Sequence, residues 1–120
     1  MLLETAAEFC RNKSAIPAVR DRIANVDTHD AALWQEMVEL GWLGITVPEA
    51  HGGLGLSLAA AVPVAEAMGR HLLGSPFLAT TLAIQALASS ASDAQQERWL
   101  PELASGAIAT VALTEEDGNW

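Results

Sequence analysis

The chain has 120 residues, 51% of them hydrophobic, and a formal net charge of −9 with only six basic residues. This length suits one domain with an ordinary core, and the excess of Ala and Leu over β-branched residues favours a helical fold. The acidic balance excludes a nucleic-acid surface, which requires clustered Lys and Arg.

The cysteine content and the absence of long apolar runs bear on the protein's location. A single cysteine, Cys10, excludes an internal disulfide and a CxxC metal site, which favours a reducing cytoplasmic setting. The first residues lack the basic and apolar regions of a signal peptide. No stretch reaches the roughly 18 apolar residues of a membrane span. We therefore expect a cytoplasmic protein without membrane insertion.

Hydrophobic periodicity predicts three helices in the first third of the chain. Residues 1–12 carry Leu3 and Cys10 among the apolar positions of one helix. Pro17 suits the first turn of a second, short helix. A third begins at a cap supplied by Thr28 or Asp30 and ends at Gly41.

Residues 41–56 form a connector with five of the nine glycines beside several large apolar residues. Glycine permits positive φ and close backbone approach, whereas the apolar side chains need a dry environment. The connector is therefore predicted to be an ordered, partly buried crossover.

Three further helices are expected. The first begins at Ser57 and runs to about Leu72, with a bend at Pro63. Ser75-Pro76 starts a nearly all-apolar helix over 77–88, which predicts burial in the domain or against a partner. A capping box at 92–95 starts the last helix, with Trp99 on its inner side, Pro101 as a bend or restart, and Gly106 as its end.

Residues 107–113 have a β-branched bias and read as a strand, which requires a sheet that these 120 residues do not supply. The predicted fold is therefore an all-α, orthogonal or up-and-down bundle of about five to six helices with one C-terminal β-strand from a missing β domain.

Residue chemistry alone identifies no catalytic group. His29, His51 and His71 have no second ligand at metal spacing, so no metal site is expected. Cys10 lies on an apolar helix face, as a buried small hydrophobe does. The glycines at 52–55 follow no strand and lack a P-loop lysine, so they do not form a phosphate loop.

Several motifs, taken in order, resemble the N-terminal domain of acyl-CoA dehydrogenases. They are Leu33-Trp34-Gln35-Glu36-Met37-Val38-Glu39-Leu40-Gly41-Trp42-Leu43-Gly44, Val47-Pro48-Glu49-Ala50-His51-Gly52-Gly53-Leu54-Gly55, Val64-Ala65-Glu66-Ala67-Met68-Gly69-Arg70, Gln95-Gln96-Glu97-Arg98-Trp99-Leu100-Pro101-Glu102-Leu103-Ala104-Ser105-Gly106 and Ala112-Leu113-Thr114-Glu115. The resemblance covers nearly the whole chain.

The resemblance implies a flavoenzyme of acyl or fatty acid metabolism that dehydrogenates an acyl-CoA thioester and uses FAD. It also implies a homotetramer and an electron-transfer partner. Residues 1–106 correspond to the family's N-terminal helical domain and 107–120 to the start of its truncated middle β domain. The catalytic carboxylate belongs to the family's C-terminal domain, so the 120 residues alone are expected to be inactive.

When the family's cofactor-binding positions are assigned to the matching motif, the resemblance implies that Val111, Leu113 and Thr114 would face or hydrogen-bond FAD. Leu78 and Leu82 would fall near the acyl-tail pocket, with core packing as the alternative. Glu116 replaces the family's proline, and Asp117-Gly118-Asn119-Trp120 replaces its Gly-Ser-Asp, so the usual serine contact to the FAD phosphate is missing.

Two other interpretations stay open at this point. The chain could be a non-catalytic helical interaction subunit of a dehydrogenase-like complex. It could also be the same domain of an acyl-CoA oxidase or flavin monooxygenase. In either case an isolated chain is expected to associate through its apolar surface.

Overall fold

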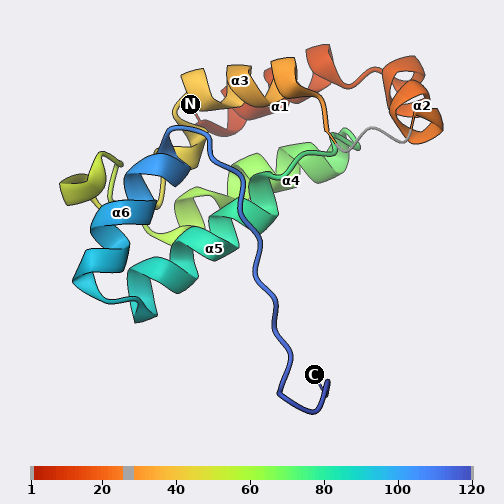
Figure 1. Ribbon diagram of the computed structural model, residues 1–120. Helices are drawn as coiled ribbons and strands as arrows, with labels where there is room; N and C mark the ends of the chain where they lie inside the picture. Colours follow the sequence, from red (N-terminus) through yellow and green to blue (C-terminus); the bar gives the residue numbers. More distant parts are fainter. Residues whose placement is uncertain (1, 26–28, 120) are drawn as a thin grey trace.

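The computed structural model describes residues 2–25 and 29–119. Within these residues the chain forms six α-helices, three short 3₁₀ turns and no strand, which confirms the predicted all-helical fold. The six helices are α1 (Leu2–Lys13), α2 (Ile16–Ala24), α3 (Ala31–Glu39), α4 (Val62–Arg70), α5 (Phe77–Ser90) and α6 (Asp93–Ala104). Helix α1 packs on α4, and α5 forms a hairpin with α6 (Figure 1).

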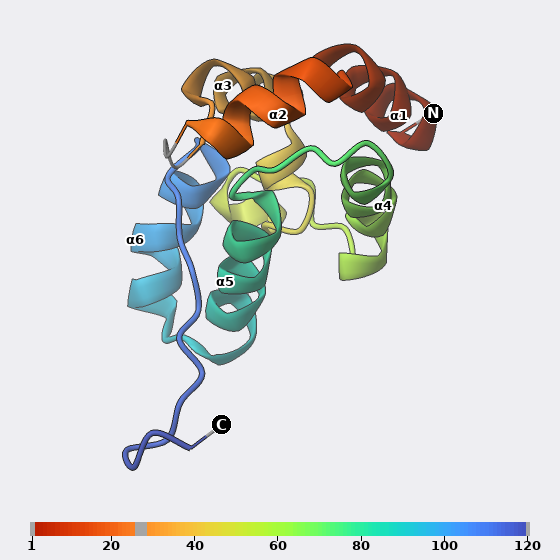
Figure 2. The ribbon, with the colours of Figure 1, turned by 90° about the vertical axis from the view of Figure 1, so that its right-hand side faces the viewer.

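Figure 2 shows α1, α2 and α3 together at one end of the molecule, with the α5/α6 hairpin pointing away from them. An ion pair between Lys13 Nζ and Glu36 Oε2, 2.6 Å apart, joins α1 to α3. The C-terminal segment leaves the end of α6 and runs past α5 to the far end of the molecule.

Local capping determines where several helices begin and end. The Asp30 carboxylate accepts a hydrogen bond from the Leu33 amide at 3.0 Å at the start of α3, whereas the alternative cap Thr28 lies outside the described residues. Helix α3 ends at Glu39, and Gly41 follows with a φ of 75°, the left-handed conformation expected after a helix. At α6, the Gln95 side chain accepts from the Ser92 amide at 2.9 Å, as in the predicted capping box.

The prediction of one continuous helix over residues 57–72 is wrong. A 3₁₀ turn at Leu58–Ala60 comes first, and α4 then begins at Val62 with Pro63 in its first turn. Proline has no amide hydrogen to donate, and the first turn of a helix is where none is required. Pro63 therefore starts a helix and does not bend one, whereas α6 continues through Pro101.

The crossover over residues 41–56 folds back on itself. Its second half donates main-chain hydrogen bonds to its first half: Leu54 to Gly44 at 2.8 Å, Gly55 to Val47 at 2.8 Å and Leu56 to Ile45 at 3.0 Å. Residues 42–47 are buried. The predicted packed connector is thus confirmed, although Leu54 and Leu56 are exposed.

Two groups of buried side chains form the core. The larger joins α1, α3, α4 and the crossover, and Phe9 meets Trp42 edge-to-face with ring centroids 5.0 Å apart. The smaller joins Val47 to the α5/α6 hairpin. The crossover contributes to both groups, so it connects the helices of the larger group with the α5/α6 hairpin.

The strand predicted over residues 107–113 is not formed. This segment has no regular secondary structure, and the described part of the chain offers no neighbouring strand. A strand needs main-chain partners on a second strand, which explains the difference. Two side chains differ from the expected apolar pattern: Leu3, placed on the apolar side of the first helix, and Trp99, predicted on the inner side of the last helix, are both exposed.

Candidate functional site

The α5/α6 hairpin and the C-terminal segment enclose an apolar groove of about 460 Å³. Its walls are Ala83, Ala86 and Leu87 of α5, Trp99 and Leu103 of α6, and residues 107–112. The Arg98 guanidinium lies 4.5 Å from the centre of the partly exposed Trp99 ring and forms a cation–π contact with it. Of the carboxylates in the described residues, none lines the groove.

The predicted cofactor residues lie along the C-terminal segment. Val111 is half-buried and lines the groove, whereas Leu113 and Thr114 lie beyond it. Leu113 is 75% exposed. With the described part of the chain, residues 110–114 form no hydrogen bond, so their amides and carbonyls are available to another partner.

Two side chains from distant helices hold the beginning of this segment. Trp34 of α3 donates its indole Nε1–H to the carbonyl oxygen of Gly106 at 2.8 Å. Thr80 of α5 is fully buried, and its Oγ1 accepts from the Ala109 amide at 3.3 Å. The same hydroxyl is 3.4 Å from the Ala109 carbonyl oxygen, to which it donates.

Gly106 permits the close approach to α3. Its φ is 109°, a conformation that side chains rarely adopt. A Cβ at this position would lie 2.9 Å from Cγ2 of Val38. Glycine is therefore required here for both backbone conformation and space.

The predicted substrate residues, Leu78 and Leu82, lie one turn apart on the outer side of α5. They are 58% and 47% exposed, so the alternative of core packing is wrong for both. Neither lines the groove. The buried side of α5 carries Phe77, Thr80, Thr81, Ala83 and Ile84 instead.

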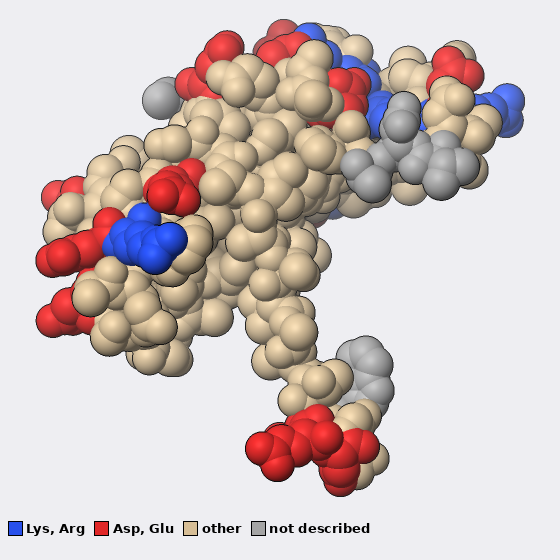
Figure 3. All heavy atoms as spheres, in the orientation of Figure 1, with Lys and Arg blue, Asp and Glu red and all other residues tan. Residues whose placement is uncertain are grey.

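Charge is distributed unevenly around this region. Helix α5 contains no charged residue. In Figure 3 the surface over α5 is uncharged, while acidic side chains gather around α6 and at the end of the C-terminal segment. Those at the end of the segment are Glu115, Glu116 and Asp117.

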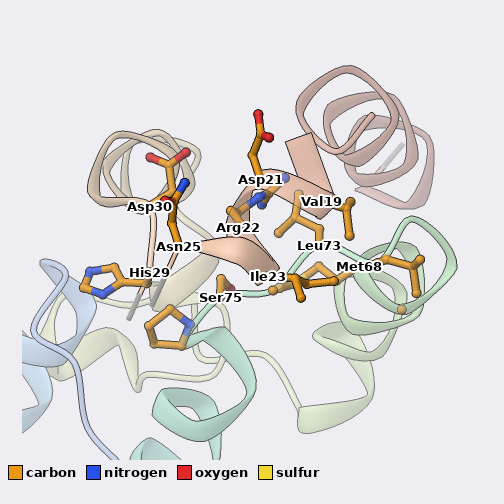
Figure 4. A pocket seen from close by; sticks show the side chains of 14 residues that line it. Val19, Asp21, Arg22, Ile23, Asn25, His29, Asp30, Met68, Leu73 and Ser75 are labelled. Atoms are coloured by element: carbon orange, nitrogen blue, oxygen red, sulfur yellow. The ribbon is translucent and has the colours of Figure 1, made fainter. Parts of the chain in front are cut away.

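A larger hollow, of about 870 Å³, lies between α2, the start of α3 and the α4–α5 connection (Figure 4). Val19, Ile23, Met68 and Leu73 give it apolar walls, and polar side chains such as His29 and Ser75 lie at its edge. None of the five predicted site residues lines it. Its residues come from segments without a shared motif, so the sequence pattern does not reveal it.

The backbone at the edge of this hollow is strained. Leu72 has a φ of 53°, the one positive value among the described non-glycine residues, and is 62% exposed. It follows α4 at the position where helices commonly place glycine. Leu73, the next residue, is buried and directs the chain toward α5.

Within the described residues, no group of three or more His, Cys, Asp or Glu side chains could hold a metal ion. Cys10 is completely buried on α1, and burial raises the pKa of its thiol. A raised pKa opposes formation of the nucleophilic thiolate. Among the described helices, none is long and apolar enough to cross a membrane.

Comparison with known proteins gives similarities along almost the whole chain. A family model described as "Acyl-CoA dehydrogenase, N-terminal domain" matches residues 1–107. The chain is 38% identical over 119 residues to acyl-CoA dehydrogenase IpdE2 of Mycobacterium tuberculosis (strain ATCC 25618 / H37Rv), covering 98% of this chain and 36% of that protein. It is 39% identical over 84 residues to (2S)-methylsuccinyl-CoA dehydrogenase of Cereibacter sphaeroides, covering 68% of this chain and 15% of that protein.

A solved structure has the same fold. The Tcur3481-Tcur3483 steroid ACAD G363A variant matches with a TM-score of 0.85 and 32% identity, over 96% of this chain and 32% of that chain. The chain spans 36% of the length of IpdE2, 15% of the length of the methylsuccinyl-CoA dehydrogenase and 32% of the length of the solved structure.

Proposed function

The chain belongs to the acyl-CoA dehydrogenase family, whose N-terminal domain it carries, and from this we propose that it is part of an FAD-dependent acyl-CoA dehydrogenase. The family match over nearly the whole chain is the observation that carries the proposal. Residues 1–106 are its helical N-terminal domain, and 107–120 begin its middle β domain.

The proposed reaction is α,β-dehydrogenation of an acyl-CoA thioester, in acyl or lipid catabolism. A carboxylate removes the α-proton, and bound FAD supplies the hydride acceptor. That carboxylate belongs to a part of the enzyme outside these 120 residues.

The C-terminal segment is suited to contact the flavin. Its chemistry combines an exposed apolar side chain, Leu113, with a hydroxyl at Thr114 and main-chain groups that lack partners in the described chain. A flavin ring presents apolar faces and a polar edge, so it can use both kinds of contact. Val111, Leu113 and Thr114 are the residues proposed to hold it.

Helix α5 is proposed to contribute to the acyl pocket. Leu78 and Leu82 form an uncharged, exposed stripe, which matches the chemistry of an acyl chain. The names of the relatives include methylsuccinyl-CoA and a steroid ACAD, so the substrate is assigned only as an acyl-CoA thioester. The proposal includes a homotetramer, an electron-transfer partner and a cytoplasmic location, as the family resemblance and the single cysteine favour.

The test is expression of the complete reading frame that contains these 120 codons. FAD is expected to co-purify, and anaerobic addition of a panel of acyl-CoA thioesters is expected to bleach the flavin bands. The 120-residue chain alone, desalted after mixing with FAD, is the control and is expected to retain no flavin.

Each contrary result has a distinct meaning. A full-length product that is flavin-free, or that no thioester bleaches, would refute the dehydrogenase function. Acyl-CoA oxidation by the 120 residues alone would refute the division of roles. Stoichiometric hydrogen peroxide formation in air would identify an oxidase instead.

A second candidate is a helical subunit that pairs with a separate dehydrogenase-like subunit. The specific observation is that the name of the solved relative, Tcur3481-Tcur3483, joins two protein designations. Affinity purification of the tagged protein from its native cells tests this alternative. A flavin-containing second subunit in stoichiometric amount would support it, and a homomeric flavoprotein would refute it.

A further inference from the structure

The start of the C-terminal segment is held by two side chains that have no other described hydrogen-bond partner. Trp34 and Thr80 come from different helices, α3 and α5, and bind positions 106 and 109 of the segment. Two attachments three residues apart fix both the position of a chain along its length and its rotation about its own axis.

The Thr80 contact resembles a strand pairing. In an antiparallel sheet, a residue pair exchanges both of its main-chain hydrogen bonds. Here a single buried hydroxyl accepts from the Ala109 amide and donates to the Ala109 carbonyl. Thr80 thus occupies the place that a neighbouring strand residue would take, on the side of the segment that faces α5.

The Trp34 contact opposes sliding of the C-terminal segment along α3. Trp34 is 6% exposed, and its indole ring is packed in the larger core group. Gly106 fits closely against Val38 of the same helix, and a Cβ there would be too near. A shift of the segment by one residue would place a residue with a side chain at this point, since Ser105 and Ala107 flank Gly106.

Register decides which side chains the segment presents. A slip of one residue would move every side chain of the segment by one position along α5. With position 109 attached, residues 107–112 line the groove and Leu113 is the first residue beyond it. Loss of the attachment would let the segment present Ala112 in place of Leu113.

We propose that Trp34 and Thr80 are positioning residues that set the register of the C-terminal segment and thereby orient Leu113 and Thr114 toward the flavin. The orientation toward flavin rests on the proposed function, whereas the register itself does not. Neither residue contacts the cofactor in this scheme. Both act through Gly106 and Ala109.

The first experiment uses amide hydrogen exchange in the 120-residue chain to measure how firmly the segment is attached at Ala109. Thr80→Val keeps the volume and removes both hydrogen bonds. It is expected to speed exchange at Ala109 by about 5- to 10-fold, the effect of losing one modest hydrogen bond. Trp34→Phe is expected to speed exchange at the amide of Ala107 in the same direction.

Thr81→Val is the matched control. Thr81 is the next residue of α5 and is buried, and its side-chain hydroxyl forms no hydrogen bond within the described part of the chain. It is expected to leave exchange at Ala109 unchanged relative to the rest of the bundle. Equal exchange at Ala109 in Thr80→Val and Thr81→Val would overturn the positioning role.

The second experiment places the same three variants in the flavin-containing product of the complete reading frame. Thr80→Val and Trp34→Phe are expected to weaken FAD retention several-fold and to shift the flavin absorbance bands, while Thr81→Val does neither. Faster exchange at Ala109 with unaltered flavin bands and retention would overturn the orientation toward flavin. Lack of flavin in the wild-type product would refute the proposed function, and the exchange experiment would still test the attachment at Ala109.

Discussion

Gly53 lies where the crossover passes back over Val47, and the space there admits no side chain. A Cβ at Gly53 would overlap the carbonyl oxygen and Cβ of Val47. Val47 is fully buried and accepts the hydrogen bond from Gly55 through the same carbonyl oxygen, so it has little freedom to move. The requirement for glycine at this position is steric, because its φ is not positive.

Gly53→Ala is therefore expected to lower the free energy of unfolding by about 2 to 3 kcal/mol, as overpacking does in rigid sites. Urea titration followed by tryptophan fluorescence measures the change. Gly74→Ala is the control: an added Cβ there meets nothing within 4 Å, and the expected effect is below about 0.5 kcal/mol. Equal urea midpoints for the two variants would show that the backbone at Val47 moves to accommodate the added Cβ.

At the scale of single elements, the end of α4 carries the least favourable backbone. Leu72 occupies the left-handed region, where an L-residue costs about 1–2 kcal/mol. Its side chain is mostly exposed and offsets little of this cost through burial. Glycine at the same position would relieve the strain, at a cost of about 0.5–1 kcal/mol in the entropy of the unfolded chain.

Leu72→Gly is accordingly expected to raise the free energy of unfolding by about 0.5 to 1 kcal/mol. Thermal unfolding monitored by circular dichroism gives the comparison. Leu73→Ala, at a buried neighbour, is expected to cost about 2–5 kcal/mol. A loss of stability in Leu72→Gly would mean that the leucine side chain packs across the hollow beside it.

The helices were predictable because their signals are local. Asp30, Gly41 and the Ser92/Gln95 pair mark helix ends through contacts within one turn, and the structure places ends at each. The role of Pro63 is not predictable from local sequence, because it depends on whether a helix already precedes this residue. In the structure a 3₁₀ turn precedes it, and Pro63 lies in the first turn of α4.

The candidate site was less predictable because its features depend on distant contacts. An apolar α5 does not reveal which side faces the core, so Leu78 and Leu82 needed the structure. The Trp34–Gly106 contact spans 72 residues, and no local pattern signals it. The larger hollow likewise joins segments that are far apart in sequence.

At the scale of the whole molecule, the uncharged surface over α5 is exposed to solvent in an isolated chain. Exposed leucines on α5 and on the C-terminal segment bring apolar side chains into water without charged neighbours on that helix. Contiguous apolar surface of this kind promotes association. An isolated 120-residue chain is therefore expected to self-associate as its concentration rises.

Replacing both Leu78 and Leu82 with Gln is expected to shift the association midpoint to at least about tenfold higher concentration, as loss of two partly buried leucines implies. Sedimentation velocity across a concentration series measures this. Leu3→Gln, at an exposed leucine on α1, is the control and is expected to change little. A monodisperse wild-type monomer at high concentration would contradict the prediction.

The fold-back of the crossover also bears on the order in which the chain folds. Its main-chain hydrogen bonds join residues within the span from 44 to 56, so closing this loop costs little chain entropy. The attachment of Gly106 to Trp34 has to wait for a far longer loop. Short-range closure precedes long-range docking when other factors are equal. We therefore expect the crossover to close early during folding and the C-terminal segment to dock on α3 after it.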